Sequence, residues 1–166
     1  IFVIVFTIMY GGIQYSNGTL LPERELDEEE RQIRSALWTA IDHERRQLDR
    51  SPARRSNSEA VAAQGTVIRL ADHNRSGGDS VSSEGGSRIH SVSNGGPFCS
   101  QAAVSFDIPN RQIPPVEVAR LGRSKLALAD DAGIRFRGAG YVNGIGVTID
   151  GSRVYLVYRS CAIITP

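Results

Sequence analysis

Residues 22–50 read PERELDEEERQIRSALWTAIDHERRQLDR, and this stretch carries the clearest secondary-structure pattern of the 166-residue chain. Its apolar side chains recur mainly at steps of three, four and seven, as on one face of a helix: Leu26, Ile33, Leu37, Ala40, Ile41 and Leu48. Pro22 suits a first helical turn, where its missing N–H would have no partner. Ser51-Pro52 ends the pattern, because the residue before a proline disfavours helical backbone angles. The sequence therefore predicts an amphipathic helix over residues 22–50.

The charges along this stretch support the same helix. Residues 23–30 hold six acidic side chains and one Arg, whereas residues 31–55 hold seven Arg and three acidic side chains. Acidic groups at the start and basic groups at the end complement the helix macrodipole, each by about 0.3–1 kcal/mol.

The stretch before the helix, residues 1–15, reads IFVIVFTIMYGGIQY and is almost wholly apolar. A membrane-spanning helix takes about 20 apolar residues, and polar Gln14, Ser16 and Asn17 follow too soon. The sequence opens at Ile1 rather than Met, so we expect residues 1–21 to be an apolar anchor segment that is truncated at its start. A core strand, favoured by the β-branched side chains, and the remnant of a signal peptide stay open as alternatives.

The best β pattern lies near the end of the chain. Residues 141–149 alternate through Ile145, Val147 and Ile149, and residues 153–158 form the returning run. The Asp150-Gly151 dipeptide between them predicts a hairpin with a type I′ turn.

Shorter apolar runs predict further elements after residue 50. Residues 51–64 read as a connection and residues 65–72 as a strand bounded by glycine and polar residues. Residues 73–97 read as a flexible loop with a short strand near 88–92, and strands are expected over 98–108 and 133–137. For residues 116–121 and 125–129, strand and helix stay equally open.

Together these patterns predict an α+β fold in three parts. The apolar anchor segment 1–21 leads to the amphipathic helix 22–50, which packs on a β-rich domain over 51–166. The β structure is expected to be an antiparallel sheet or a small sandwich.

Charge and cysteine content restrict the cellular role. A net charge of +1 argues against a nucleic-acid partner. Cys99 and Cys161 have no zinc-finger or redox-motif spacing, but in an oxidising compartment they can pair and close a loop of about 60 residues, worth about 4 kcal/mol. Free buried thiols are the alternative for a reducing compartment. Two glycosylation triplets begin at Asn17 and Asn74, and with the apolar leader they favour the disulfide.

The chain shows no catalytic pattern. His43, His73 and His90 are scattered, and no nucleophile is spaced beside them. The arginines at residues 45–55 read as a solvated helix end, since no aromatic residues alternate with them to stack bases. We therefore expect no enzyme activity, no cofactor, no metal and no small-molecule substrate.

An apolar N-terminal segment, an amphipathic continuation and a β-rich C-terminal region with a late cysteine resemble the type IV pilin superfamily. Residues 1–15, the helix to Arg50 and the terminal run GIRFRGAGYVNGIGVTIDGSRVYLVY carry the likeness. The chain departs from the superfamily at position 5, where Val5 replaces the expected Glu. The resemblance implies a subunit whose apolar segment anchors it in the membrane and later packs in a filament core.

The expected function is therefore that of a structural subunit of a pilin-like filament at the cell surface. It would self-associate or join other filament subunits. The expected assembly residues are Ile1, Phe2, Val3, Ile4, Val5, Phe6, Ile8 and Trp38. For Trp38 a place at the edge of the core is the alternative. A second class, a monomeric membrane-anchored extracellular module that binds a ligand through loop 73–97, also stays open.

Overall fold

A computed structural model describes residues 15–16, 19–20, 26–76, 87–90, 98–108, 112–129 and 133–163. Its elements, in chain order, are β1 (Tyr15–Ser16), β2 (Thr19–Leu20), α1 (Glu28–Gln47), α2 (Asn57–Arg75), β3 (Arg88–His90), β4 (Cys99–Asp107), α3 (Pro115–Ala129), the 3-10 helix η1 (Ile134–Phe136), β5 (Tyr141–Asp150) and β6 (Arg153–Ala162). The predicted α+β class is confirmed for this part of the chain.

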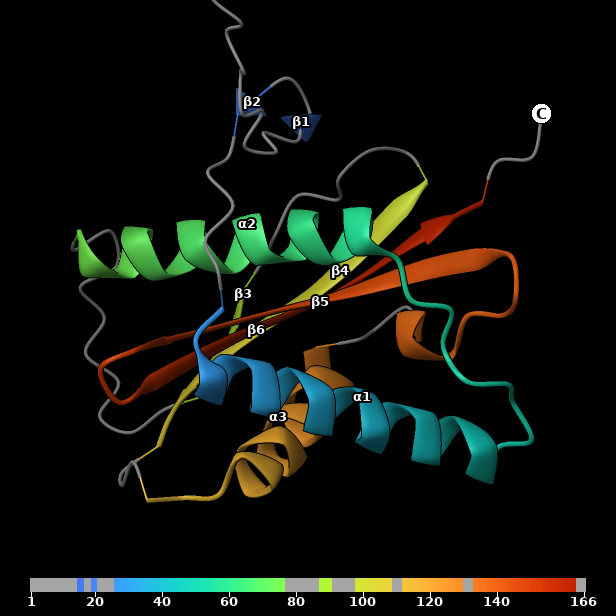
Figure 1. The fold of residues 1–166 in the computed structure, drawn as a ribbon, viewed down its shortest axis with the longest axis horizontal. Coiled ribbons are helices and arrows are strands. Elements are labelled where there is room, and N and C mark those ends of the chain that lie inside the picture. The colour runs from blue at the N-terminus through green and yellow to red at the C-terminus, as the bar shows by residue number, and fades with distance from the viewer. Residues whose placement is uncertain are drawn as a thin grey trace, which may run out of the picture.

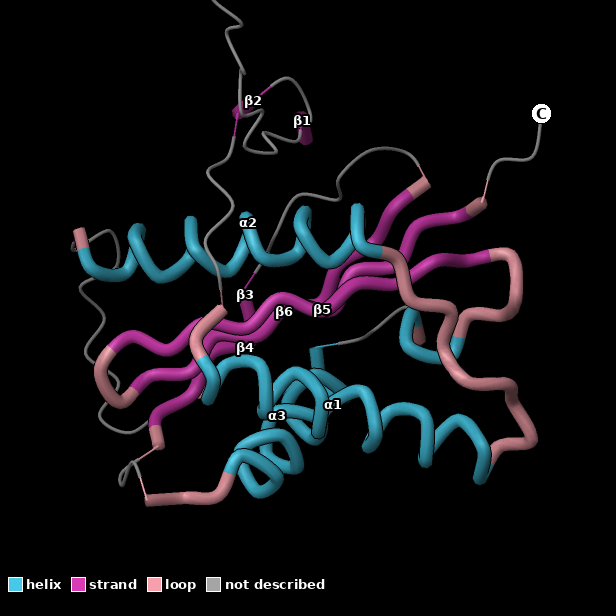
Figure 2. The backbone as a smooth tube through the Cα atoms, in the orientation of Figure 1, coloured by secondary structure: helices cyan, strands magenta, loops and turns pink. Residues whose placement is uncertain are grey.

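The central element is a four-stranded antiparallel sheet with the strand order β3-β4-β6-β5 (Figure 2). The predicted hairpin is its β5–β6 pair, in which Asp150 lies opposite Arg153. The two loop residues are therefore Gly151 and Ser152. Of these two, Gly151 has a positive φ of 63°, which fits a type II′ turn rather than the predicted type I′ turn.

Helices cover both faces of this sheet, and Figure 1 shows α1 and α3 on one side and α2 on the other. Strand residues alternate between two cores, as the period of two requires. On the α1 side, Val154, Leu156 and Tyr158 of β6 join the larger core. On the α2 side, Tyr155 and Val157 pack against small and branched side chains of α2. The four-stranded sheet and helices α1, α2 and α3 therefore form three layers.

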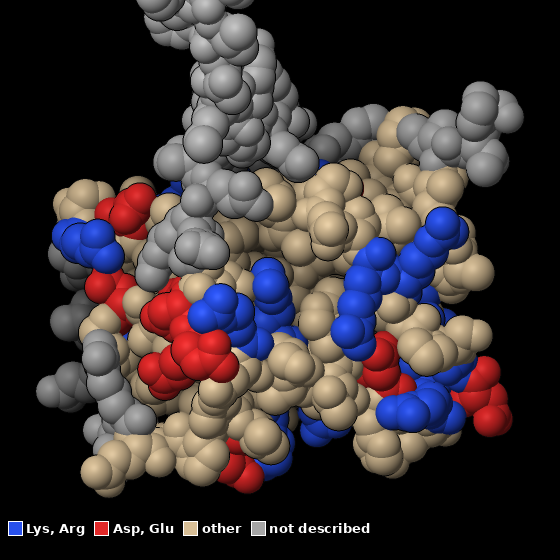
Figure 3. All heavy atoms as spheres, viewed as in Figure 1, with Lys and Arg blue, Asp and Glu red and all other residues tan. Residues whose placement is uncertain are grey.

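Helix α1 lies within the predicted range but is shorter at both ends. Asp27 caps it, since its carboxylate accepts a hydrogen bond from the Glu30 N–H at 2.8 Å and Glu30 bonds back to Asp27 N. The expected role of Pro22 in the first turn lies outside the described residues. Acidic side chains gather over the start of α1, and basic side chains predominate over its end and the connection to α2 (Figure 3).

Helix α2 replaces two elements of the sequence-based prediction. Residues 65–72 are helical rather than a strand, and the helix already starts at Asn57, inside the expected connection. Its last turn, residues 73–75, also belonged to the predicted loop. Gly65 is buried in the middle of α2, so it is no strand boundary. Ala63, Val67 and Ala71 recur every four residues and fill the core under the helix. This spacing is typical of a helix and not of a strand.

Of the elements predicted after α2, some are confirmed and others are wrong. The strands expected near 88–92 and over 98–108 are confirmed as β3 and β4. The segments left open at 116–121 and 125–129 form one helix, α3. The strand expected over 133–137 is wrong, because Gly133 takes a left-handed φ of 60° and opens the 3-10 helix η1. The described part of the expected β-rich domain over 51–166 thus also contains the helices α2 and α3 and the 3-10 helix η1.

Strand β5 forms an edge of the sheet, and other parts of the domain bond its outer backbone groups. Arg55, just before α2, pairs with Asn143 of β5 in an isolated parallel β-bridge. The Gln64 side-chain amide donates to Val147 O at 2.7 Å and accepts from Val147 N at 3.0 Å, as a neighbouring strand would. Glu30 Oε1 accepts from Ile149 N at 3.1 Å. These bonds close much of the β5 edge to pairing with another chain.

The apolar stretch expected to act as an anchor lies almost entirely outside the described residues. Within 1–21 the structure describes only β1 and β2, which pair with each other through Tyr15 and Leu20. Among the described helices, none is both long enough and apolar enough to cross a membrane.

Candidate functional site

The two cysteines lie opposite each other on neighbouring strands. Cys99 is the first residue of β4 and Cys161 the second-last of β6, and the register places their Cα atoms 4.0 Å apart. They form a disulfide with a sequence separation of 62 residues. The predicted pairing is therefore confirmed.

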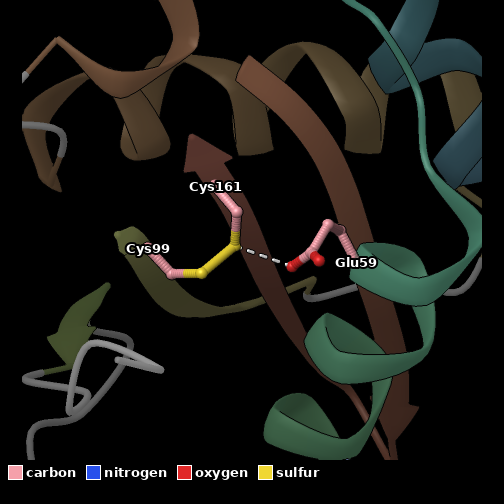
Figure 4. Close-up of side chains that lie close together, drawn as sticks. All are labelled: Glu59, Cys99 and Cys161. Atoms are coloured by element: carbon pink, nitrogen blue, oxygen red, sulfur yellow. Dashed lines mark hydrogen bonds between the residues drawn. A yellow bond between two sulfur atoms is a disulfide. The ribbon is translucent and has the colours of Figure 1, made fainter. Parts of the chain in front are cut away.

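A carboxylate from α2 lies against this disulfide (Figure 4). Glu59 Oε2 is 2.8 Å from Cys161 Sγ, and it accepts a hydrogen bond from Arg159 Nε at 2.6 Å. Arg159 precedes Cys161 by two residues, so both side chains point to the α2 face of β6. We call Glu59, Cys99, Cys161 and Arg159 the Cys–Glu cluster.

This cluster is mostly shielded from solvent. Arg159 is 7% exposed and Cys161 5% exposed, whereas Glu59 and Cys99 are half-buried. The Glu59–Arg159 ion pair is therefore less screened than a surface pair and fixes the position of the carboxylate. A disulfide sulfur carries no proton, so the contact between Glu59 and Cys161 can be a hydrogen bond only after reduction.

The close approach of α2 to β5 positions Glu59. The Ser56 side chain caps α2 by accepting from Glu59 N, which places Glu59 in the first turn. The helix backbone at Glu59 lies directly over Gly144, and at Ala63 directly over Gly146. A Cβ at either glycine would collide with this backbone, so the two glycines allow the helix to come close enough.

The sequence predicts the cysteine pair but not the positions of Glu59 and Arg159 beside it. A usable signal was present, because Ser56 followed three residues later by Glu59 is the pattern of a helix start. That pattern predicts α2, but no spacing in the sequence predicts that its first turn meets the disulfide.

Trp38, an expected assembly residue, lies in the core. Its side chain is 7% exposed, and its ring meets that of Tyr158 edge-on with 6.0 Å between the centroids. The Arg55 guanidinium lies over the ring, 4.9 Å from its centroid, and also bonds to Asp42 at 2.8 Å. This geometry favours the alternative role at the edge of the core.

The other assembly residues, Ile1, Phe2, Val3, Ile4, Val5, Phe6 and Ile8, lie outside the described residues, as does the glycosylation candidate Asn17. Asn74 lies in the last turn of α2 and is half-buried. A glycan acceptor is typically found on an exposed loop, so this position is less suitable than the sequence indicated.

Arginines at residues 45–55 donate hydrogen bonds to backbone carbonyl groups in other parts of the chain. Arg45, which is 4% exposed, donates to Ser51 O at 2.7 Å and to Arg137 O at 3.1 Å. Arg50 donates to Phe136 O. These bonds join the end of α1 and the connection after it to η1 and the residue that follows η1. The predicted solvated helix end is therefore only partly right.

The three histidines stay apart, on α1, α2 and β3. His43 contacts the Gln47 side chain at an exposed position, and His90 Nε2 lies 2.8 Å from Ser105 Oγ. His73 lies in the last turn of α2 rather than at a strand end.

No protein-family model and no curated protein matches this sequence. The geometry of the described residues is therefore the basis for assigning a role.

Proposed function

We propose that the chain is a structural subunit of a pilin-like filament at the cell surface. In this proposal the apolar residues 1–15 anchor the subunit in the membrane before assembly. They then pack with copies of themselves or with other filament subunits. The mechanism is assembly, without a cofactor, a small-molecule substrate or a nucleic-acid partner.

The proposal rests on the domain that follows residues 1–15, because its described part buries its apolar side chains without that stretch. Within the described residues, helices cover both faces of the sheet, and the buried apolar side chains from Ile33 to Tyr158 pack into two cores. This domain does not need a further apolar strand on either face. An apolar stretch joined to such a domain is costly to expose to water, so it calls for a membrane or a protein partner.

Two further features support this location and this architecture. The Cys99–Cys161 disulfide suits an oxidising compartment outside the cytosol. Helix α1 starts soon after the apolar stretch and is built into the domain through Ile33, Leu37 and Ile41. A segment held in a filament core would therefore be coupled to the folded domain through a short connection.

The direct test is to isolate surface material from cells that produce the full chain and to image it by electron microscopy. We expect filaments with a regular subunit repeat. The variant Phe6→Arg should abolish them, because it puts a charge into the apolar segment, whereas Phe6→Leu should retain them.

A monodisperse monomer that leaves the membrane without detergent would contradict the proposal. A monomer that stays in the membrane fraction and never forms filaments would also contradict it, and would favour the monomeric binding module.

A further inference from the structure

We infer that the Cys–Glu cluster binds one thiophilic divalent cation of the zinc class when its disulfide is reduced, and that disulfide and metal exclude each other. Cys99, Cys161 and Glu59 would supply the ligand atoms. This inference is independent of the proposed filament function, because it concerns only residues of the folded domain.

The three ligand atoms already lie together. The two sulfur atoms and a carboxylate oxygen of Glu59 are all within 4.8 Å of one another. A tetrahedral zinc site with Zn–S bonds of about 2.3 Å separates its sulfur atoms by about 3.8 Å. Cys99 and Cys161 stand opposite each other with Cα atoms 4.0 Å apart, so side-chain rotation can provide that separation without moving the strands.

The donor set suits a zinc-class cation. Thiolate sulfur and carboxylate oxygen are both zinc ligands, and three protein ligands leave a fourth position for water. Arg159 would act from outside the ligand shell, because its Nε–H holds the Glu59 carboxylate at 2.6 Å. Two thiolates and one carboxylate carry three negative charges, which one divalent cation and the Arg159 guanidinium offset.

Reduction is the step that opens the site. A phosphine or dithiol reductant delivers two electrons to the Cys99–Cys161 bond, and each sulfur takes up one proton. The Cys161 thiol can then donate its proton to Glu59 Oε2, which already lies 2.8 Å away. Cation binding displaces both thiol protons to solvent. A small-molecule disulfide can then take up two electrons and leave as two thiolates, which re-forms the Cys99–Cys161 bond and releases the cation.

The test uses the full chain and cadmium, whose bonds to thiolate give an ultraviolet charge-transfer band. We expect the chain reduced with a phosphine to bind one equivalent of cadmium and to show this band. The oxidised chain should show no band. Glu59→Gln should weaken binding by about tenfold or more, and Arg159→Met by about tenfold, the scale on which lost supporting contacts reduce metal affinity.

A matched control separates the proposed site from cadmium bound by cysteines alone. Glu44 is another half-buried helical glutamate and lies 3.6 Å from Arg123, so Glu44→Gln should leave the affinity unchanged. Equal affinities for Glu59→Gln and Glu44→Gln would overturn the inference, as would a reduced chain without a band.

Loss of the disulfide can also unfold the chain. In that case cadmium should restore the folded circular dichroism spectrum of the reduced wild-type chain, and should restore the Glu59→Gln chain only at about tenfold higher concentration or above. Refolding of both chains at the same cadmium concentration would equally overturn the inference.

Discussion

Glu30 has a fully buried carboxylate, and hydrogen-bond donors from two elements surround it. Its Oε1 accepts from Thr148 Oγ1 at 2.9 Å and from Ile149 N at 3.1 Å, while Oε2 accepts from Asp27 N at 3.2 Å. One side chain thus caps α1 and joins its first turn to β5. A single residue here links the amphipathic helix to the sheet.

Glu30→Ala should therefore lower the free energy of unfolding by about 2–4 kcal/mol, since each buried donor left unpaired costs about 1–3 kcal/mol. Urea unfolding would measure the loss. Glu28, an exposed glutamate of the same turn, provides the control, and Glu28→Ala should cost no more than about 1 kcal/mol, the scale of a first-turn acidic group. Equal effects of the two substitutions would mean that the buried bonds contribute little.

Trp38 gives a second prediction for a single side chain. Its burial in the larger core predicts that Trp38→Ala lowers the free energy of unfolding by about 3–5 kcal/mol. Leu48, which is 55% exposed, provides the control, and Leu48→Ala should cost less than about 0.5 kcal/mol. Unchanged stability together with lost assembly would instead restore the interface role expected from the sequence.

Among the elements, the sequence predicted those whose signals are local. Helix α1 has its apolar stripe and graded charge, and the β5–β6 hairpin has alternation and a glycine at the turn. Helix α2 was missed because Val67, Ile68 and Leu70 resemble a short strand and Gly65 resembles its boundary. Only packing against the sheet shows that these residues share a helix with Ala63 and Ala71.

The close contact between α2 and β5 predicts that adding a methyl group at Gly146 lowers stability. Gly146→Ala would push a methyl group against the helix backbone at Ala63, and such overpacking costs about 1–3 kcal/mol. In Gly138→Ala the added Cβ meets no atom within 4 Å, so this variant should retain the wild-type midpoint. Thermal unfolding of the two variants measures the difference, and equal midpoints would contradict the close approach.

At the scale of the whole molecule, the sheet is buried on both faces, and this arrangement could not be predicted from the sequence. The alternation in β5 and the glycine at the turn indicate a hairpin, but Val154 to Tyr158 of β6 is apolar throughout because helices lie above and below it. The cysteine pair was predicted from its number and context. The cluster that α2 forms around it depends on Glu59, whose place is set by tertiary packing.

The disulfide joins the start of β4 to the end of β6 and should contribute to global stability. Reduction by a phosphine, in the presence of a metal chelator, should lower the free energy of unfolding by about 4 kcal/mol in the chain-entropy description. Denaturant unfolding with and without the reductant measures the change. The double variant Cys99→Ser with Cys161→Ser should show the lower stability in both conditions; an unchanged midpoint for the reduced wild type would contradict this prediction.

If the domain from Leu26 onward folds by itself, residues 1–15 serve contacts outside it. Thermal unfolding of a chain lacking residues 1–15, followed by circular dichroism in detergent-free buffer, measures whether it does. We predict a soluble protein with a single cooperative transition, because both cores are built from residues after the deletion. An aggregated chain, or one without a cooperative transition, would show that the domain needs residues 1–15 and would assign IFVIVFTIM to a core strand.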